Sequence, residues 1–528
     1  GENIAQNTTR SIESSLEFWQ KLHLSQVQMK ILEHPREEML RRLQFLKDVG
    51  LGYLTLDRPT KTLSGGEAQR IRLASQLGSG LTRSIYVLDE PTIGLHSSDT
   101  QKLIHTLHDI RSKGNTLVIV EHDEEVIRNS DYLVDIGPNA GKYGGKIVAK
   151  GKIEDIEKKN SLTVDYLCKR KEIPTPSEYR TRNKNDVLAI KGANTNNLKN
   201  IDVEFPLGTF CVVCGVSGSG KSSLVFGDVE QYLITQIEKR EIERKKNRSL
   251  KKSNAKKNKY KNNDEVRPFP QKYLCVDQSP IGRSPRSTPA SYCDIMNPIR
   301  EVFSQTKLSR QRGYKVGRFS FNASTGRCEY CEGKGSTLIE MHFLSDVWLE
   351  CESCQGARFN QATMEVKFNG KNIAEVLEMS VDEAIDFFVN QPKILRKLKA
   401  LQELGLGYIQ LGQPANQFSG GEAQRIKLAK ELAKGSRSRN CCFLLDEPTT
   451  GLHFEDVNKL IQSFHRLVDS GHTIIVIEHN LDIIKNADFV VELGPEGGKY
   501  GGEIIFAGNP KELQTTATPT GIILKKHI

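Results

Sequence analysis

Four short apolar runs along the chain end in charged residues. The runs are Ile85 to Leu88, Leu117 to Val120, Phe443 to Leu445 and Ile474 to Ile477. Their length and their content of leucine and β-branched residues are typical of parallel strands that are buried on both faces. Open α/β sheets present ligand-binding groups at the carboxyl ends of such strands. The pattern therefore predicts an α/β fold with functional charges where these runs end.

A helical period of apolar positions begins at Glu67 and again at Glu422, within two nearly identical segments. Both segments start with Ser-Gly-Gly-Glu-Ala-Gln-Arg-Ile, and both are followed by Asp-Glu-Pro-Thr and then by Glu-His. The spacing from Asp89 to His122 and from Asp446 to His479 is the same, 33 positions. Such self-similarity indicates a duplicated unit. We expect residues 1–175 to form the C-terminal part of a first half, and residues 186–528 to form a second half.

One phosphate-loop motif, Gly-x4-Gly-Lys-Ser, stands in the second half. It follows a strand expected at Val212 to Cys214 and precedes an apolar helix start at Leu224. In that context backbone amides cradle phosphate oxygens, Lys221 would neutralise the β and γ phosphates, and Ser222 would ligate Mg²⁺. The alternative is an ordinary glycine turn, which the full pattern disfavours. The candidate nucleotide-binding residues are Gly215, Val216, Ser217, Gly218, Ser219, Gly220, Lys221, Ser222 and Ser223.

The charged residues that follow the other strands have the chemistry of a hydrolytic site. Asp446 could hold the magnesium shell, Glu447 could polarise an attacking water, and His479 could contact the γ phosphate and orient that water. A solvated acidic pair and a structural histidine are the alternatives, and the repeated register argues against both. The corresponding candidates in the first half are Asp89, Glu90 and His122.

The two Ser-Gly-Gly-Glu segments, called the signature motifs below, permit two interpretations. Two glycines before a helix leave amides free for an anion, and the helix dipole favours negative charge there. Serine followed three residues later by glutamate is also a capping box, and both interpretations can hold at once. The candidate residues are Ser64, Gly65, Gly66 and Glu67 in the first copy, and Ser419, Gly420, Gly421 and Glu422 in the second.

Four of the eleven cysteines form two Cys-x2-Cys pairs within a module at residues 326–358. The paired cysteines are Cys328, Cys331, Cys351 and Cys354. This spacing predicts a tetrahedral four-thiolate zinc site, and four protein ligands indicate a structural metal. A catalytic zinc would need an open position, and disulfides are not expected in a reducing compartment.

Charge and hydropathy add broader expectations. No apolar stretch approaches the roughly 18 residues of a membrane helix, and no secretory signal opens the chain, so we expect a cytoplasmic protein without a membrane partner. The net charge of +10 over 528 residues permits a polyanionic partner without requiring one. Arg240 to Lys261, in a lysine-rich insertion placed at 236–270, has little to bury. A solvated, disordered insertion is expected there, with an arm that contacts nucleic acid as the alternative.

Together these motifs resemble ABC-type ATPases. The resemblance implies composite sites, in which the phosphate loop and Asp-Glu of one half face the signature motif of the other half. Lys221, Ser222, Asp446, Glu447 and His479 would face Ser64, Gly65 and Gly66, while Asp89, Glu90 and His122 would face Ser419, Gly420 and Gly421. Because Lys221 precedes Ser419 by 198 positions, the equivalent lysine of the first half is expected before residue 1, in a chain truncated at its N-terminus. The expected fold is α/β, with two ABC-type halves, the first one partial, and an inserted four-cysteine zinc module.

The segments between the repeats resemble the UvrA family, the damage-sensing ATPases of bacterial nucleotide excision repair. The resemblance rests on the segments 276–287, 318–322 and 340–344, on the four-cysteine module, and on the sequence Asp-Glu-Pro-Thr-x-Gly-Leu-His that begins at Asp89 and at Asp446. It implies a homodimeric ATPase that uses ATP, Mg²⁺ and Zn²⁺, binds damaged double-stranded DNA and loads the helicase UvrB. It also implies that Gln278 is a glutamine near the magnesium ion and the attacking water. The alternatives are a UvrA-like paralogue in resistance to DNA-binding drugs, and a non-catalytic fragment that binds DNA and zinc.

Overall fold

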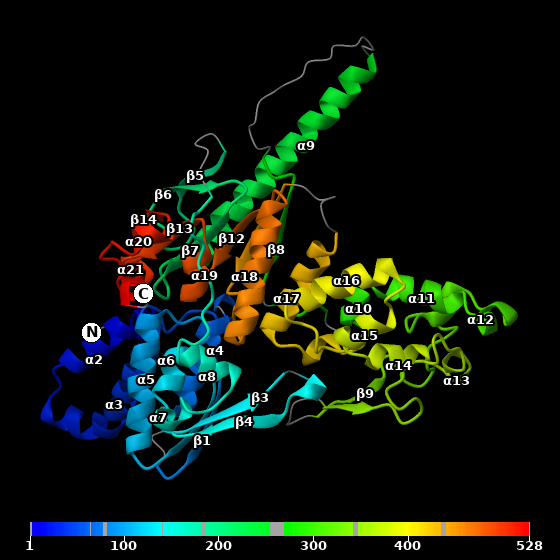
Figure 1. Cartoon of the computed structure of the whole chain (residues 1–528). Coiled ribbons are helices and arrows are strands. Elements are labelled where there is room, and N and C mark those ends of the chain that lie inside the picture. Colours follow the sequence, from blue (N-terminus) through cyan, green and yellow to red (C-terminus); the bar gives the residue numbers. More distant parts are fainter. Residues whose placement is uncertain are drawn as a thin grey trace.

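The computed structural model describes residues 3–63, 65–77, 82–139, 141–180, 186–253, 269–277, 279–282, 284–341, 347–434 and 440–526. Ser64, Gln278 and residues 254–268 of the insertion, for which expectations are given above, lie outside the described residues. Figure 1 shows the first half in blue and cyan beneath the sheet of the second half, and an arm of green and yellow helices that extends to one side.

The second half is built on a six-stranded sheet with the order β14-β13-β7-β12-β11-β8. All neighbouring strands are parallel except β14, which runs antiparallel to β13. The central strands β7, β12 and β13 are buried along their whole length, as predicted for parallel strands covered on both faces. The strands are β7 (Phe210–Gly215), β8 (Lys272–Val276), β11 (Cys441–Asp446), β12 (Thr473–Ile477), β13 (Phe489–Gly494) and β14 (Glu503–Gly508).

Two hydrophobic layers cover this sheet. On one face lie the antiparallel pair β5 (Val187–Ala193) and β6 (Ile201–Pro206) and the π-helical segment η4 (Ser223–Val229) that follows the phosphate loop. On the other face lies α18 (Phe454–Asp469), which buries Phe464 in the larger core. Other helices of this half include α17 (Gly420–Leu432), α19 (Leu481–Asn486), α20 (Pro510–Leu513) and α21 (Pro519–Lys526).

The strands of the first half form two separate pairs. β1 (Ile85–Asp89) and β2 (Thr116–Val120) are parallel, and β3 (Leu133–Gly137) and β4 (Lys146–Gly151) are antiparallel. In the second half β7 joins the corresponding strands β12 and β13, but no described strand joins β2 to β3.

One face of β1 and β2 is consequently open to solvent. Ile85 and Val87 are 72% and 69% exposed, and Val118 and Val120 are about half exposed. The prediction that Ile85 to Leu88 and Leu117 to Val120 are buried on both faces is therefore wrong, although it is right for the second half. The physical reason is that no described counterpart of β5, β6, β7 or η4 covers this face.

Helices pack on the other face of β1 and β2. Leu103 and Leu107 of α5 and Leu51 contribute to a separate core with Tyr86 and Leu88. The helices of this half are α1 (Ile4–Thr8), α2 (Ile12–Lys21), α3 (Gln26–Leu46), α4 (Gly65–Leu77), α5 (Ser97–Ser112), α6 (Glu124–Arg128), α7 (Ile153–Ile156) and α8 (Leu162–Leu167). A π-turn η1 (Lys47–Leu51) follows α3.

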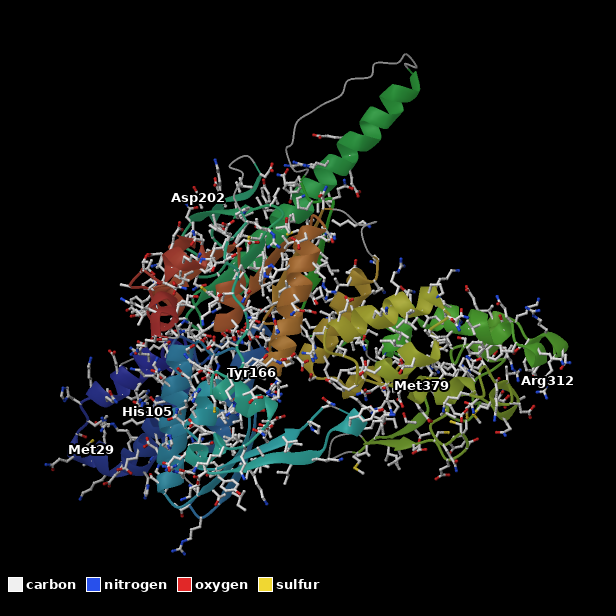
Figure 2. All side chains as sticks on the ribbon, in the orientation of Figure 1. Met29, His105, Tyr166, Asp202, Arg312 and Met379 are labelled. Carbon is white, nitrogen blue, oxygen red and sulfur yellow. The ribbon has the colours of Figure 1, made fainter. Side chains whose placement is uncertain are left out.

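The arm between β8 and α17 contains the cysteine module on a short hairpin, and Figure 2 places Arg312 at its far end. Its elements are α10 (Pro289–Tyr292), α11 (Met296–Ser304), α12 (Lys307–Gln311), β9 (Ser336–Ile339), β10 (Val347–Glu350), α13 (Gln361–Met364), α14 (Ile373–Glu378), α15 (Val381–Phe387) and α16 (Pro392–Glu403). No helix among the described residues is long and apolar enough to cross a membrane.

The lysine-rich insertion begins as a helix. α9 (Glu230–Ser253) runs through Arg240 and projects from the body of the molecule. The expectation of a disordered segment is therefore wrong for residues 240–253. The reason is local, because this stretch is rich in Lys, Arg and Glu, which favour helices, and contains neither glycine nor proline.

Candidate active site and metal centre

The phosphate loop connects the carboxyl end of β7 to the start of η4. Gly215, Gly218 and Gly220 have φ values of 129°, 76° and 103°, a region that side chains rarely adopt. A Cβ atom on Gly215 would also lie 2.0 Å from the carbonyl oxygen of Leu493 on the neighbouring strand. The glycines are thus required by the path of the chain, and the loop ends at the amino end of a helical segment, where anions bind.

Lys221 lies folded over this loop. Its Nζ donates to the carbonyl oxygens of Gly215 and Val216, at 3.0 and 2.9 Å, and the residue is only 7% exposed. Burial lowers the pKa of Lys221 to about 8, against the opposing effect of the Glu447 carboxylate. A buried cation whose hydrogen bonds go only to neutral carbonyls suits an anionic ligand.

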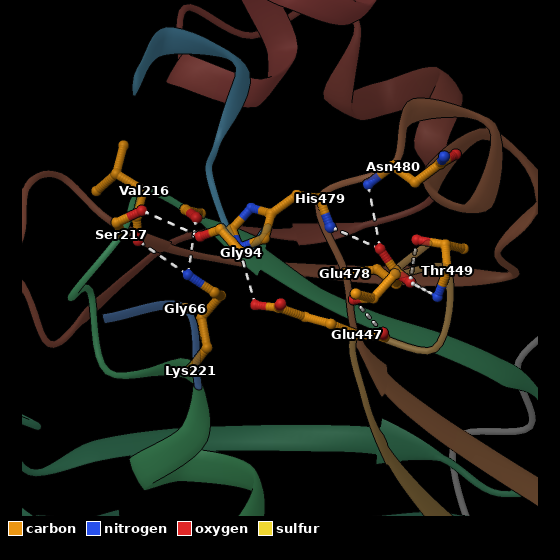
Figure 3. A network of polar contacts seen from close by, with 12 residues as sticks. Gly66, Gly94, Val216, Ser217, Lys221, Glu447, Thr449, Glu478, His479 and Asn480 are labelled. Atoms are coloured by element: carbon orange, nitrogen blue, oxygen red, sulfur yellow. Dashed lines mark hydrogen bonds and ion pairs between the residues drawn. The ribbon is translucent and has the colours of Figure 1, made fainter. Parts of the chain in front are cut away.

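Asp446 is the last residue of β11, and Glu447 follows it with a φ of 44°. A left-handed glutamate is strained, and such strain concentrates at functional sites. Burial raises the pKa of Glu447 to about 7, and Glu478 adds to the shift. Burial likewise raises the pKa of Asp446 to about 7, with Glu447 as the second cause. Figure 3 shows Lys221, Glu447 and His479 converging on one region.

His479 lies two positions after β12, with its Nε2 atom 3.8 Å from Oε1 of Glu447. Burial holds the pKa of His479 well below its ordinary value, and the positive charge of Lys221 adds to this effect. Neither ring nitrogen has a hydrogen-bond partner among the described residues, and the same holds for Oγ of the buried Ser219 in the loop. The two ring nitrogens of His479 and Oγ of Ser219 are therefore able to bind a phosphate group or the water that attacks it.

A glutamate that precedes each histidine explains the fixed register of the two repeats. Glu478 accepts hydrogen bonds from the amide and hydroxyl of Thr449, at 2.9 and 2.7 Å, and from the amide of His479 at 3.0 Å. Glu121 makes the same three contacts with Thr92 and His122, at 2.9, 2.6 and 3.0 Å. This carboxylate joins the ends of two neighbouring strands. The sequence interpretation assigned it no role, although the Glu-His repeat was a signal for it.

Segments of the first half contact the phosphate loop of the second half. Arg70, on α4, donates from Nη1 to Oγ of Ser217 at 3.4 Å, and that hydroxyl donates to the carbonyl oxygen of Gly94 at 3.4 Å. A Cβ atom on Gly94 would lie 3.1 Å from Oε2 of Glu447. The structure therefore places the phosphate loop of the second half against the signature helix of the first half, as the ABC resemblance implies. Arg70 itself was not among the predicted site residues.

The first signature motif begins α4 at Gly65. Gly66 is packed tightly, since a Cβ atom there would lie 3.0 Å from the carbonyl oxygen of Ile93. Glu67 is buried and accepts a hydrogen bond from the hydroxyl of Tyr53 at 2.5 Å. Glu67 is thus held within its own half, on the side of the helix start that adjoins the phosphate loop.

The second signature motif forms the capping box that the sequence allows. Oγ of Ser419 accepts from the amide of Glu422 at 3.2 Å, and Oε2 of Glu422 accepts from the amide of Ser419 at 2.9 Å. Gly420 and Gly421 start α17, and a Cβ atom on Gly421 would lie 2.5 Å from the carbonyl oxygen of Thr450. The capping box is therefore formed, and it is compatible with anion binding at the same helix start.

The predicted second composite site has a similar arrangement. Glu90 has a φ of 46°, and its Oε1 atom lies 3.7 Å from Nε2 of His122. Burial raises the pKa of Glu90 to about 7, with Asp89 as the second cause. A Cβ atom on Gly451 of the second half would lie 3.0 Å from Oε1 of Glu90. Arg425, which corresponds to Arg70, is 4% exposed, and its Nε and Nη1 atoms have no partner among the described residues.

Gln424 is a further residue that the sequence interpretation missed. Its Nε2 atom donates to the carbonyl oxygens of Val276 and Asp446, at 3.0 and 2.7 Å. It therefore joins the ends of β8 and β11 to the second signature helix. Its place in the repeated sequence Gly-Gly-Glu-Ala-Gln is the feature that could have indicated this role.

The four paired cysteines form one buried cluster. Their sulfur atoms all lie within 4.8 Å of one another, and Sγ of Cys331 is 3.6 Å from Sγ of Cys354. Tetrahedral zinc, with Zn–S bonds of about 2.3 Å, separates its sulfur ligands by about 3.8 Å. All four cysteines are free of disulfides, and the amide of Gly335 donates to Sγ of Cys331 at 3.3 Å. The donor set and its spacing fit zinc.

Comparison with known proteins identifies the family. No family model matches the chain. It is 51% identical to UvrABC system protein A of Staphylococcus epidermidis over 527 residues, and 51% identical to that of Thermus thermophilus over 529 residues. These alignments cover 99% and 100% of this chain and 54% of each relative, so the chain spans about half the length of the curated relatives.

A solved structure agrees with these matches. The crystal structure of UvrA2 from Deinococcus radiodurans superimposes on the whole chain with a TM-score of 0.87 and 40% sequence identity, and the match covers 64% of that protein. The likeness extends over both halves and the cysteine module, which supports the α/β fold with two ABC-type units. The chain belongs to the UvrA family.

Proposed function

We propose that this chain binds and hydrolyses ATP at a composite site between its two halves. The observation that carries the proposal is the meeting of Lys221, Glu447 and His479 of the second half with Arg70 and Gly94 of the first. The division into residues 1–175 and 186–528 is part of the proposal. Measurement of ATP turnover by the variant Lys221→Ala tests the proposal, and this variant should lose turnover.

Each group has a role that its surroundings support. The glycine-rich loop and Lys221 would bind the phosphates, and Ser222 and Asp446 would hold Mg²⁺. Magnesium, when bound, neutralises charge that develops on the transferred phosphoryl group. Glu447 would accept a proton from the attacking water, and the neutral His479 would orient that water through a ring nitrogen.

The raised pKa of Glu447 predicts the pH dependence of turnover. A carboxylate that must accept a proton acts in its ionised form, and its pKa of about 7 places the loss of activity at and below neutral pH. Lys221 must stay charged, and its pKa of about 8 limits activity on the alkaline side. We expect kcat/KM for ATP, which reports the pKa values of the free enzyme, to rise from pH 6 to a maximum between pH 7 and 8, with melting curves as the control for folding. A kcat/KM that is constant from pH 6 to 8 would contradict the role of Glu447.

We also propose that the chain binds damaged double-stranded DNA and acts with UvrB and a second UvrA-type protomer, in the cytoplasm. Family membership supports this, and so do the net charge of +10 and the exposed basic side chains at the end of the arm. A zinc ion held by the cysteine cluster would fix the hairpin β9–β10 within that arm. The 51% identity to curated relatives named UvrABC system protein A supports a role in repair over the drug-resistance alternative.

Salt dependence tests the DNA part of this proposal. A protein that contacts about six phosphates loses about 10³-fold in affinity between 50 and 200 mM salt, because bound counterions are released. We expect such a slope in fluorescence anisotropy with a lesion-containing duplex. Alanine at Lys307, Arg310 and Lys315, all exposed on the arm, should reduce the slope. Alanine at Lys150, Lys158 and Lys159, exposed on the first half, is the matched control. An affinity that is independent of salt, or equal slopes in the two triple variants, would contradict the assignment.

A further inference from the structure

Tyr53 lies where the first signature motif meets the phosphate loop of the second half. It follows η1 in the first half, and its hydroxyl donates to Oε1 of Glu67 at 2.5 Å. Glu67 stands in the first turn of α4. The hydroxyl of Tyr53 therefore fixes the orientation of the signature helix at its start.

The ring of Tyr53 packs against the core of its own half and also contacts the second half. A Cβ atom on Gly218 of the phosphate loop would lie 2.7 Å from three atoms of this ring. A Cβ atom on Gly497 would lie 3.2 Å from Cδ1 of Tyr53, and one on Gly498 would lie 2.9 Å from its Cβ. The amide of Gly498 also donates to the carbonyl oxygen of Gly218 at 3.0 Å. The ring is thus packed between the phosphate loop and the glycine-rich loop after β13.

The other half contains a matched pair with one difference. Tyr408 donates its hydroxyl to Glu422 of the second signature motif, and its Cβ lies 3.2 Å from a Cβ atom placed on Gly141. Gly141 corresponds to Gly498 in the repeat. Within the described part of the chain, however, Tyr408 contacts no phosphate loop. A purely structural role of the Tyr–Glu pair would apply to both tyrosines, whereas a role in the nucleotide site applies to Tyr53.

We propose that Tyr53 is a positioning residue of the ATP site, which couples the phosphate loop at Gly218 to the signature helix through Glu67. The inference rests on the proposed ATPase function. Phosphate that enters the loop displaces the segment around Gly218, and the ring that touches this glycine must follow. A tyrosine side chain has two rotatable bonds, so the displacement reaches the hydroxyl and, through it, the start of α4.

The hydroxyl of Tyr53 is suited to this role at any physiological pH. Burial raises its pKa above the ordinary value, and the nearby charge of Glu67 raises it further. Arg58 also faces Glu67, with its Nη2 atom 3.7 Å from Oε2. The phenol therefore stays protonated and remains a hydrogen-bond donor to Glu67.

Steady-state kinetics of Tyr53→Phe and Tyr408→Phe test the proposal. Phenylalanine keeps the ring against Gly218 and removes the hydroxyl that binds Glu67. We expect kcat of Tyr53→Phe to fall about tenfold, as for the loss of one hydrogen bond to a carboxylate, while KM for ATP stays within about twofold. Tyr408→Phe loses the same bond in the other half and should keep kcat within about twofold of the wild type. Wild-type kcat in Tyr53→Phe, or an equal loss in Tyr408→Phe, overturns the proposal.

Amide hydrogen exchange with a non-hydrolysable ATP analogue and Mg²⁺ separates this inference from the proposed function. In the wild type, we expect the analogue to protect both the phosphate loop at 215–222 and the signature helix at 65–77. Tyr53→Phe should keep the first protection and lose the second, and Tyr408→Phe should keep both. Protection of the helix in Tyr53→Phe overturns the coupling alone. A wild-type chain that neither binds the analogue nor hydrolyses ATP overturns the proposed function, and the inference falls with it.

Discussion

Lys221→Ala is expected to lower the rate of ATP turnover by about 10²-fold or more. The amine is the one cation of the phosphate loop, and it is buried against the carbonyl oxygens of Gly215 and Val216. Removal of a preorganised donor from a water-poor site costs about 10²- to 10³-fold in rate, because no solvent replaces it. Phosphate release measured under steady-state conditions checks this expectation.

Lys191→Ala is the matched control, because Lys191 is exposed on β5 of the same half and lies outside the loop at 215–222. It should turn over ATP at the wild-type rate. Circular dichroism and melting curves of both variants exclude a general loss of folding. Turnover at the wild-type rate in Lys221→Ala would show that the phosphate loop is not the site of hydrolysis.

Removal of one cysteine from the cluster is expected to abolish zinc binding and unfold the module at 326–358. The sulfur atoms of the four cysteines lie within 4.8 Å of one another. The few short elements around them, such as β9 and β10, bury little apolar surface. Structural zinc contributes on the order of 10 kcal/mol to the folding of such modules, so the metal supplies most of their stability. Cys351→Ser should therefore lose the bound zinc and the amide protection of the module.

Elemental analysis of the purified chain and hydrogen exchange of residues 326–358 measure this result. Cys168→Ser is the control, since Cys168 is a free cysteine on the first half and outside the cluster. It should keep one zinc ion per chain and the wild-type protection. Retention of one zinc ion in Cys351→Ser, or a wild-type chain without zinc, would contradict the assignment.

The candidate site could be predicted largely because its motifs are local. The turn at Gly215, Gly218 and Gly220 depends on a few adjacent residues, and the structure has positive φ at all three. The Cys-x2-Cys spacing likewise fixes which sulfur atoms can share one ion. The strand ends at Asp446 and His479 followed from apolar runs that the second half does bury.

The errors and omissions concern contacts between segments that are distant in sequence. Ile85 and Val87 have the composition of a doubly covered strand, but burial depends on which segment lies above them. Glu478 holds Thr449, 29 positions away, and Arg70 reaches Ser217 across 147 positions. No periodicity in the sequence indicates which distant residues form such contacts. The helix at 240–253 is a different case, because its high charge favours a solvated chain whereas its residues have high helix propensity.

The sequence alone determined the family, the phosphate loop, the register of the two halves and the four-thiolate cluster. These features depend on residue type and short spacing, which the covalent chain fixes. Tertiary structure alone decided which half contacts which loop, that Tyr53 packs on Gly218, and that one face of β1 and β2 is open. These features arise because hydrophobic burial and steric fit act between segments that folding, not sequence order, makes neighbours.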